Sequence, residues 1–503
     1  MRTVTGATDR VVVVGAGLAG LSAALHLAGR GRQVTVVERG AHPGGRVGRA
    51  DISGYRLDTG PTVLTMPDIL DETFAAVGES TSSRLDLQPV LPAYRGLFAD
   101  GSSIDVHPDA EAMTAEIARF AGPKEAQGYA ELRRWLTRLY QIEFDGFINA
   151  NFDSPLSLLT PQLAKLAAIG GFRGWEPMVR RFLSDERLLR VFTFQALYVG
   201  VPPKRALAAY AVIAYMDTVS GVYFPRGGMR ALPDAMAAAA ADAGVEFHYN
   251  APVSALERSG SRVTAVRTVN GERFPADAVI LTTELPDTYR LLGRTPRRLV
   301  KLRPAPSAVV AHVGCRAAPT ESDPSHHTIL FGEAWDRTFD EIIDQGRPMV
   351  DPSLLVTRPT LGDPTLAPDG RELLYVLAPA PNTDVGHKDW DADRDDYTDH
   401  MLETVTARLP HLGQDAELLH VVTPQDWARQ GMASGTPFAL AHTFGQTGPF
   451  RPGNTVRGID NAVLAGSSTV PGVGIPTAIV SGRLAADRVT GAATRKQPQV
   501  MSQ

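Results

Sequence analysis

Three glycines near the start of the chain have the spacing of a turn that binds a dinucleotide. Gly15, Gly17 and Gly20 follow an apolar run at residues 11–14 that contains only valine. In such a turn the first glycine permits the tight bend, the second lets the backbone approach a pyrophosphate, and the third allows the helix to pack closely on the strand. The pattern therefore indicates a site for a phosphate-bearing cofactor.

The residues around this turn complete a strand–helix–strand unit. A helix over residues 18–29 would begin at Leu18 and Ala19, whose N–H groups have no partner within the helix and can bind phosphate. A second strand at residues 34–37 ends at Glu38. The carboxylate of Glu38 can accept hydrogen bonds from a ribose diol, so we assign it to the same site.

A second glycine-rich turn directly after Glu38 favours a flavin over a nicotinamide cofactor. Gly44 and Gly45 lie in the run Pro-Gly-Gly-Arg, where no side chain keeps a ligand away from the backbone. Arg46 can pair with a phosphate or cover a ring system, and we include Arg39 in this site. The alternative interpretation is an ordinary surface turn, because Pro-Gly-Gly is good turn chemistry.

The last element of the chain offers a second place for the cofactor. A strand ending at Gly466 leads through a glycine-rich loop to Gly474, and Ile475 and Pro476 begin a helix. The positive end of this helix would face a ligand in the loop. If that ligand is a flavin, the helix would stabilise the negative charge that collects on the pyrimidine edge of the ring on reduction. The alternative is one more strand–helix unit of the sheet.

Length and composition predict a globular protein of two or three domains. The chain has 503 residues and a net charge of −5, so there is no reason to expect nucleic acid as a partner. Its single cysteine, Cys315, excludes an intrachain disulfide, and we expect no metal site.

Residues 1–9 lack the pattern of a signal peptide. Glycines and His26 interrupt the apolar stretch at 11–29, which argues against a membrane-spanning helix.

The order of the predicted elements indicates an α/β fold with a discontinuous, Rossmann-like cofactor domain. Apolar periodicity predicts mostly helix between residues 66 and 220. The stretch 205–216 is apolar on nearly all sides, which favours a core helix over a cavity wall or a bilayer contact. We expect a cofactor domain from residues 8–70, 221–290 and 455–490, an inserted α+β substrate domain made of a helical, membrane-facing part at 71–220 and a sheet-containing part at 291–454, and a disordered tail at 491–503.

Five motifs occur together in the order that one family of flavoproteins shows. They are the first glycine turn with Glu38, Pro-Gly-Gly-Arg at 43–46, Asp-Thr-Gly-Pro-Thr at 58–62, Phe-Pro-Arg-Gly-Gly-Met at 224–229, and the last glycine loop. Over about residues 11–486 the chain resembles the bacterial-type phytoene desaturases, the carotenoid desaturase branch of the amine-oxidase-like flavoproteins. The resemblance implies FAD as the cofactor, with Gly60, Pro61, Thr62 and Val253 as further binding residues.

The resemblance also implies an activity and a location. The reaction would be FAD-dependent dehydrogenation of phytoene toward neurosporene or lycopene, with a hydride passing to flavin N5 and a proton leaving the neighbouring carbon. A substrate without polar groups requires a long apolar tunnel, which helices between residues 66 and 216 could form. Because phytoene resides in membranes, we expect a cytoplasmic protein attached peripherally to the inner face of the cell membrane. Oxygen or a membrane quinone would accept the electrons.

Two departures from the family pattern concern the chemistry. The last loop carries Val470 where the family usually has histidine, which removes a polar group near the ring. After the strand near residue 281 the chain has Thr282, Thr283 and Glu284 where the family often has Asn-Ala-Asp. Glu284 is a candidate for the catalytic base, and the alternative is that the proton leaves to another weak base or to water.

Three other functions remain open. Amine oxidases and protoporphyrinogen oxidases share the first and last elements, but the spacing of aromatic residues reveals no cage for a substrate amine. A non-catalytic protein that binds prenyl groups would have the same fold. The intact cofactor elements favour an enzyme.

Overall fold

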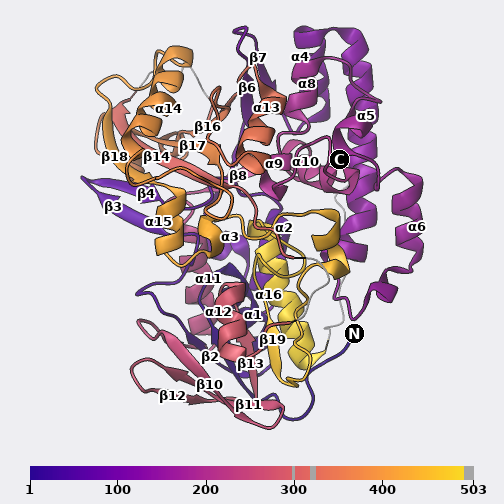
Figure 1. The fold of residues 1–503 in the computed structure, drawn as a ribbon, viewed down its shortest axis with the longest axis vertical. Helices are drawn as coiled ribbons and strands as arrows, with labels where there is room; N and C mark the ends of the chain where they lie inside the picture. Colours follow the sequence, from indigo (N-terminus) through magenta and orange to yellow (C-terminus); the bar gives the residue numbers. More distant parts are fainter. Residues whose placement is uncertain (297–300, 318–324, 492–503) are drawn as a thin grey trace.

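The computed structural model describes residues 1–296, 301–317 and 325–491. Figure 1 shows two halves, with a parallel sheet and its helices in the lower half and a mixed sheet and a helical group in the upper half. The predicted disordered tail, apart from Gly491, lies outside the described residues.

The lower half is built on a five-stranded parallel sheet. Its strand order is β19–β13–β1–β2–β9. These strands are Ala462–Leu464, Ala278–Leu281, Arg10–Val14, Gln33–Val37 and Glu246–His248, and all five lie within the three segments predicted for the cofactor domain. Three parts of the chain that are far apart in sequence therefore meet in one sheet.

Both faces of this sheet are covered, which explains why strand β1 contains only valine after Arg10. Val11 and Val13 pack in the same core as helix α1 (Leu18–Ala28), whereas Val12 and Val14 pack on the opposite side. Helix α1 lies against α16 (Ile475–Thr490) and α11 (Ala231–Asp242), and α2 (Pro67–Ala75) packs beside α16. Strands buried on both faces read as continuous apolar runs.

The opposite face carries a small antiparallel sheet and one helix. The sheet comprises β10 (Val253–Ser259), β11 (Arg262–Thr268) and β12 (Arg273–Pro275), and the helix is α12 (Leu285–Leu292). The apolar run at residues 251–256 predicts a strand, which corresponds to part of β10, whereas no pattern in the sequence indicates β11 or β12. The strands of such a meander are stabilised by packing between neighbouring strands, and short strands show little alternation of polar and apolar residues in the sequence.

The upper half is built on a seven-stranded sheet in the order β18–β14–β17–β16–β15–β6–β7. The strands are Glu417–Val422, Ser307–Arg316, Arg371–Ala380, Leu354–Thr357, His327–Leu330, Tyr94–Leu97 and Ser103–Val106. Apolar runs at residues 309–313 and 373–378 predict two strands, and both runs lie within the long central strands β14 and β17, which pair antiparallel. Cys315 of β14 is buried.

The segment predicted as a helical part, residues 71–220, is not helical throughout. Its strands β6 and β7 extend the seven-stranded sheet, and β5 (Leu87–Val90) pairs with β8 (Val222–Pro225). A further hairpin, β3 (Arg49–Ile52) with β4 (Tyr55–Asp58), precedes this segment. Strands β5 and β6 pair with β8 and β15, which lie more than a hundred residues away, so no local pattern reveals them.

Helices make up the rest of the upper half. They are α3 (Thr81–Arg84), α4 (Ala110–Ala121), α5 (Pro123–Glu143), α6 (Pro161–Ala168), α7 (Trp175–Val179), α8 (Glu186–Val191), α9 (Ala196–Val199), α10 (Val212–Thr218), α13 (Trp335–Phe339), α14 (Arg394–Arg408) and α15 (Pro424–Arg429). The apolar stretch 205–216 is not one helix but a 3₁₀ turn, Ala208–Ala211, that continues into α10.

Candidate cofactor and substrate cavity

A single large cavity connects the two halves of the molecule. Its volume is about 1340 Å³, and its walls include both glycine turns, the last loop, helices of the upper half and strands of the seven-stranded sheet. Pockets for one small ligand are typically about 300–1000 Å³. A cavity of this size can hold a dinucleotide and a second, long molecule together.

The two glycine turns lie against each other at the nucleotide end of the cavity. The N–H of Gly44 donates a hydrogen bond to the carbonyl oxygen of Ala16 at 2.8 Å. A Cβ atom on Gly45 would lie 3.2 Å from the Cα atom of Gly17, and Gly45 has a φ of +57° that favours glycine. At Gly17 and Gly45, therefore, no side chain lies between the backbone and the space for the ligand, as the sequence predicted.

Most of the predicted cofactor residues line this cavity. The lining residues among them are Gly15, Gly17, Leu18, Ala19, Glu38, Arg39, Gly45, Arg46, Gly60, Pro61, Thr62, Val253, Gly466, Gly474, Ile475 and Pro476. Gly20 does not line it: a Cβ atom there would lie 2.0 Å from the carbonyl oxygen of Gly15. Gly20 thus serves the close packing of α1 on the turn and has no direct access to the ligand.

Glu38 already has hydrogen-bond partners in the protein. Its carboxylate accepts hydrogen bonds from the N–H groups of Ala16 at 2.7 Å and Gly40 at 2.8 Å. These bonds fix the carboxylate at the tip of β2, between the two glycine turns. The side chain is 9% exposed and borders the cavity. The carboxylate of Glu38 is thus already oriented to accept hydrogen bonds from a ribose diol.

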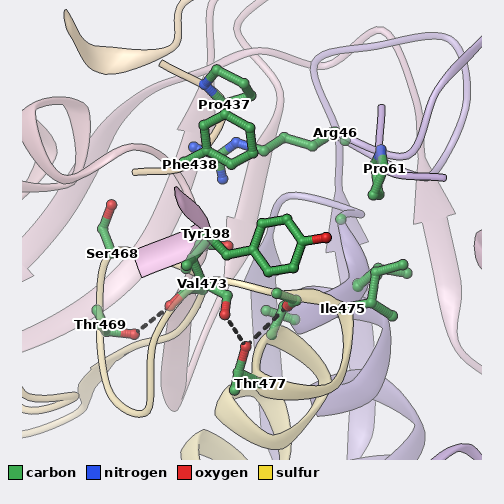
Figure 2. Close-up of a pocket in the computed structure, with 18 of the residues that line it drawn as sticks. Arg46, Pro61, Tyr198, Pro437, Phe438, Ser468, Thr469, Val473, Ile475 and Thr477 are labelled. Carbon is green, nitrogen blue, oxygen red and sulfur yellow. Dashed lines mark hydrogen bonds between the residues drawn. The ribbon is translucent and has the colours of Figure 1, made fainter. Parts of the chain in front are cut away.

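Arg46 and Glu284 form an ion pair across the cavity wall. Figure 2 shows the Arg46 side chain reaching along the wall beside Phe438, which comes from a distant loop. The carboxylate of Glu284 is thus engaged by a guanidinium from a segment 238 residues away.

The last loop presents the N-terminus of α16 to the cavity. Gly466 and Gly474 have φ values of +115° and +123°, which suit glycine alone among the common residues. The hydroxyl group of Thr477 donates to the carbonyl oxygens of Val473 at 2.6 Å and Gly474 at 3.1 Å, which fixes the first turn of the helix (Figure 2). The free N–H groups of this turn then face the cavity, where they favour negative charge on a ligand.

A buried arginine holds this loop in place. The guanidinium of Arg451 donates to the carbonyl oxygens of Ser467 at 2.6 Å and Thr469 at 3.0 Å within the loop, and to that of Leu440 at 3.3 Å outside it. Arg451 is 2% exposed, and burial lowers its pKa to about 10. No short motif reveals this role of Arg451, because its partners are backbone carbonyl groups of distant residues.

A histidine from another segment packs against the same loop. A Cβ atom on Gly472 would lie 2.2 Å from Cε1 of His442, so only glycine fits there. His442 lines the cavity, and its Nδ1 is 3.2 Å from the hydroxyl oxygen of Tyr210. Burial lowers the pKa of His442 well below its usual value, so the imidazole is neutral. The loop that carries Val470 in place of histidine thus still has an imidazole beside it.

Beyond the nucleotide end the cavity is apolar. Its walls there are formed by aliphatic and aromatic side chains from the 140–216 segment, the seven-stranded sheet and the 427–450 segment, including Phe147, Ile148, Phe152, Leu163, Leu166, Phe194, Leu197, Val212, Ile213, Met216, Ile329, Leu355 and Phe438. The stretch at 205–216, expected to be core, serves both purposes: Ala208, Ala211 and Ala214 are buried in the hydrophobic core, whereas Tyr210 and Ile213 line the cavity. Long apolar ligands bind through burial of their surface in such walls.

Comparison with known proteins relates the whole chain to flavoproteins. The family model "Flavin containing amine oxidoreductase" matches residues 18–490. A phytoene dehydrogenase from Streptomyces griseus is 59% identical over 502 residues, which cover 99% of this chain and 98% of that protein. A zeta-carotene-forming phytoene desaturase from Myxococcus xanthus is 36% identical and covers 95% of this chain and 93% of its own length.

The fold has counterparts among solved structures. An oxidoreductase from Methanosarcina mazei superimposes with a TM-score of 0.63 at 16% identity, covering 94% of this chain and 99% of that one. At this identity the likeness concerns the fold.

Proposed function

The chain belongs to the phytoene desaturases within the flavin containing amine oxidoreductase family, and from that premise we propose that it desaturates phytoene to neurosporene or lycopene. FAD is its cofactor. The bare backbone at Gly17 and Gly45, the oriented carboxylate of Glu38 and the N-terminus of α16 fit a dinucleotide whose ring lies toward the apolar part of the cavity. When bound, FAD supplies the acceptor for a hydride.

One observation carries this proposal: the nucleotide turns open directly into a long apolar space. A hydrocarbon offers no group for hydrogen bonding, so the protein can hold it only by excluding water and fitting its shape. A molecule held by the walls from the 140–216 segment and from the sheet would lie against the last loop and Tyr198, which line the same cavity. Orientation by close contact is then the main contribution of the protein to the rate.

The extent of desaturation is the finer part of the proposal. Relatives are named for three different products, namely zeta-carotene in Myxococcus xanthus, neurosporene in Rhodobacter capsulatus and lycopene in a Paracoccus strain. We place this chain with the neurosporene- and lycopene-forming proteins. Oxygen or a membrane quinone would reoxidise the cofactor.

Expression in cells that make phytoene but no coloured carotenoid tests the activity. We expect the cells to turn yellow to red, and separation of the pigments by chromatography with their absorption spectra to give the number of new double bonds. Cells with the empty vector serve as the control. Unchanged, colourless phytoene in the presence of soluble, FAD-loaded protein would contradict the proposed reaction.

We further propose that the protein attaches to the inner face of the cell membrane through an apolar rim around the cavity. No helix among the described residues has the length and apolarity needed to cross a bilayer. Large apolar side chains are instead exposed on short turns: Leu156 and Leu159 are 74% and 76% exposed, and Phe444 is 64% exposed. The turn at Pro155–Leu158 contacts the turn at Gly448–Phe450, where Phe450 packs on Phe444. Because Phe444 and Phe450 also line the cavity, a substrate could enter from lipid.

Replacing Leu156, Leu159 and Phe444 with glutamate tests this attachment. We expect at least about tenfold weaker binding to phosphatidylcholine vesicles containing phosphatidylglycerol, because burial of each large apolar side chain stabilises by about 1.5–3 kcal/mol. Sedimentation with the vesicles measures it. A matched control carries glutamate at Val350, Val385 and Leu418, which are also exposed but lie outside these turns. Equal binding of both triple variants would argue against the rim.

A further inference from the structure

The apolar part of the cavity contains two carboxyl groups that have no cationic partner. Among the described residues that line it between positions 140 and 220, Glu143 and Asp217 are the only acidic side chains. Asp217, at the end of α10, is 3% exposed, and its Oδ2 atom is buried without a hydrogen-bond partner. A buried acid without a cationic partner costs stability in an apolar wall, so its presence points to a role in the chemistry.

Asp217 belongs to a polar cluster that faces the cofactor end of the cavity. The phenol of Tyr94 interacts with both the carboxyl group of Asp217 and the phenol of Tyr198. Gln195 also interacts with the carboxyl group, and no charged residue in the described part of the chain does. Figure 2 shows the ring of Tyr198 in the middle of the pocket, with its hydroxyl group directed to the side bordered by Pro61 and Ile475. Pro61 and Ile475 were both assigned to the cofactor site from the sequence.

We propose that Asp217 accepts the proton that the substrate loses during desaturation, with Tyr94 and Tyr198 as positioning residues. This inference rests on the proposed function. In the step, one allylic carbon loses a hydride, which the oxidised cofactor accepts. The C–H bond on the neighbouring carbon breaks, its proton goes to a carboxylate oxygen of Asp217, and its electron pair becomes the new π bond. The substrate is oxidised by two electrons, and no further reactant is required.

Asp217 is better suited to accept a proton than Glu143 or Glu284, the two other acids considered. Burial raises the pKa of Asp217 to about 7, and Tyr94 and Gln195 counter this only in part. A base whose pKa lies near the working pH is both available and strong enough to take a proton. Burial raises the pKa of Glu143 well above its usual value, so that group is protonated. Glu284 is paired with Arg46.

The pH dependence of cofactor reduction in a single turnover tests the proposal. Because only the ionised form of Asp217 can accept a proton, we expect the rate constant to rise with pH and to reach half its maximum near pH 7. Asp217→Asn should be slower by about 100-fold or more, as is typical when a general base is lost, and should lose this rise. Asp217→Glu should retain the rise with a changed midpoint.

A second measurement does not depend on turnover. Infrared difference spectra of the FAD-loaded protein should show a carboxyl band that titrates near pH 7 in the wild type and is missing from Asp217→Asn. The asparagine is of equal size and neutral, so its FAD content and melting temperature should match those of the wild type or exceed them. A pH profile and band that persist in Asp217→Asn would overturn the proposal. Absence of any turnover by the wild type would instead overturn the proposed function.

Discussion

Gly17→Val is expected to give a folded protein that no longer retains FAD. The only neighbouring heavy atom within 4 Å of a Cβ at this position is the Cα of Gly45, at 3.9 Å, and the φ of Gly17 is −73°, which valine readily adopts. The side chain therefore fits the protein itself. It would instead occupy the space between the two glycine turns, where the pyrophosphate must approach the N-terminus of α1.

The loss should amount to at least about a hundredfold in FAD affinity, or about 2.8 kcal/mol. Flavin absorbance of the purified protein and titration of the apoprotein with FAD measure it. Gly453→Val is the matched control, because Gly453 has open space around it and does not line the cavity. Gly20→Val should differ from both, since its Cβ would meet the carbonyl oxygen of Gly15 at 2.0 Å and fold stability would fall. Stoichiometric FAD in the Gly17 variant would contradict the placement of the pyrophosphate.

The parts of the cofactor site that were predictable are those whose partners are close in sequence. The turn at Gly15, the acid at Glu38 and the glycine pair before Arg46 all lie within one strand–helix–strand unit, where spacing along the chain sets spacing in space. The last loop was predictable for the same reason, because its glycines directly precede the helix that they position. Periodicity likewise predicted β14 and β17, which are ten residues long.

The remaining features depend on contacts between distant segments, which a single sequence does not encode in any pattern. Glu284 is 238 residues from Arg46, and no spacing rule could have predicted their ion pair. Strand β6 joins β15 from more than 200 positions away. The one local signal that was available is Asp217 itself: an acid at the end of an otherwise apolar run is unusual in a core helix.

Arg451→Met is expected to lower both fold stability and FAD affinity. The guanidinium connects the 440–446 segment to the loop that precedes α16, through carbonyl oxygens that methionine cannot satisfy. A hydrogen bond from a charged donor contributes about 1.5–3 kcal/mol, and each buried carbonyl left without a partner costs about 1–3 kcal/mol. We therefore expect the free energy of unfolding to fall by about 3 kcal/mol.

The change in FAD affinity distinguishes the positioning of the loop by Arg451 from a general stabilisation of the core. Once the loop is released, the N-terminus of α16 is no longer held toward the cavity, so FAD affinity should fall at least about tenfold even below the melting temperature. Arg451→Lys should recover little, because one ammonium group cannot reach carbonyl oxygens on both segments. Arg457→Met is the control, since Arg457 is exposed and nearby in the chain. If Arg451→Met binds FAD as tightly as Arg457→Met does, the buried guanidinium stabilises the fold without positioning the loop for the cofactor.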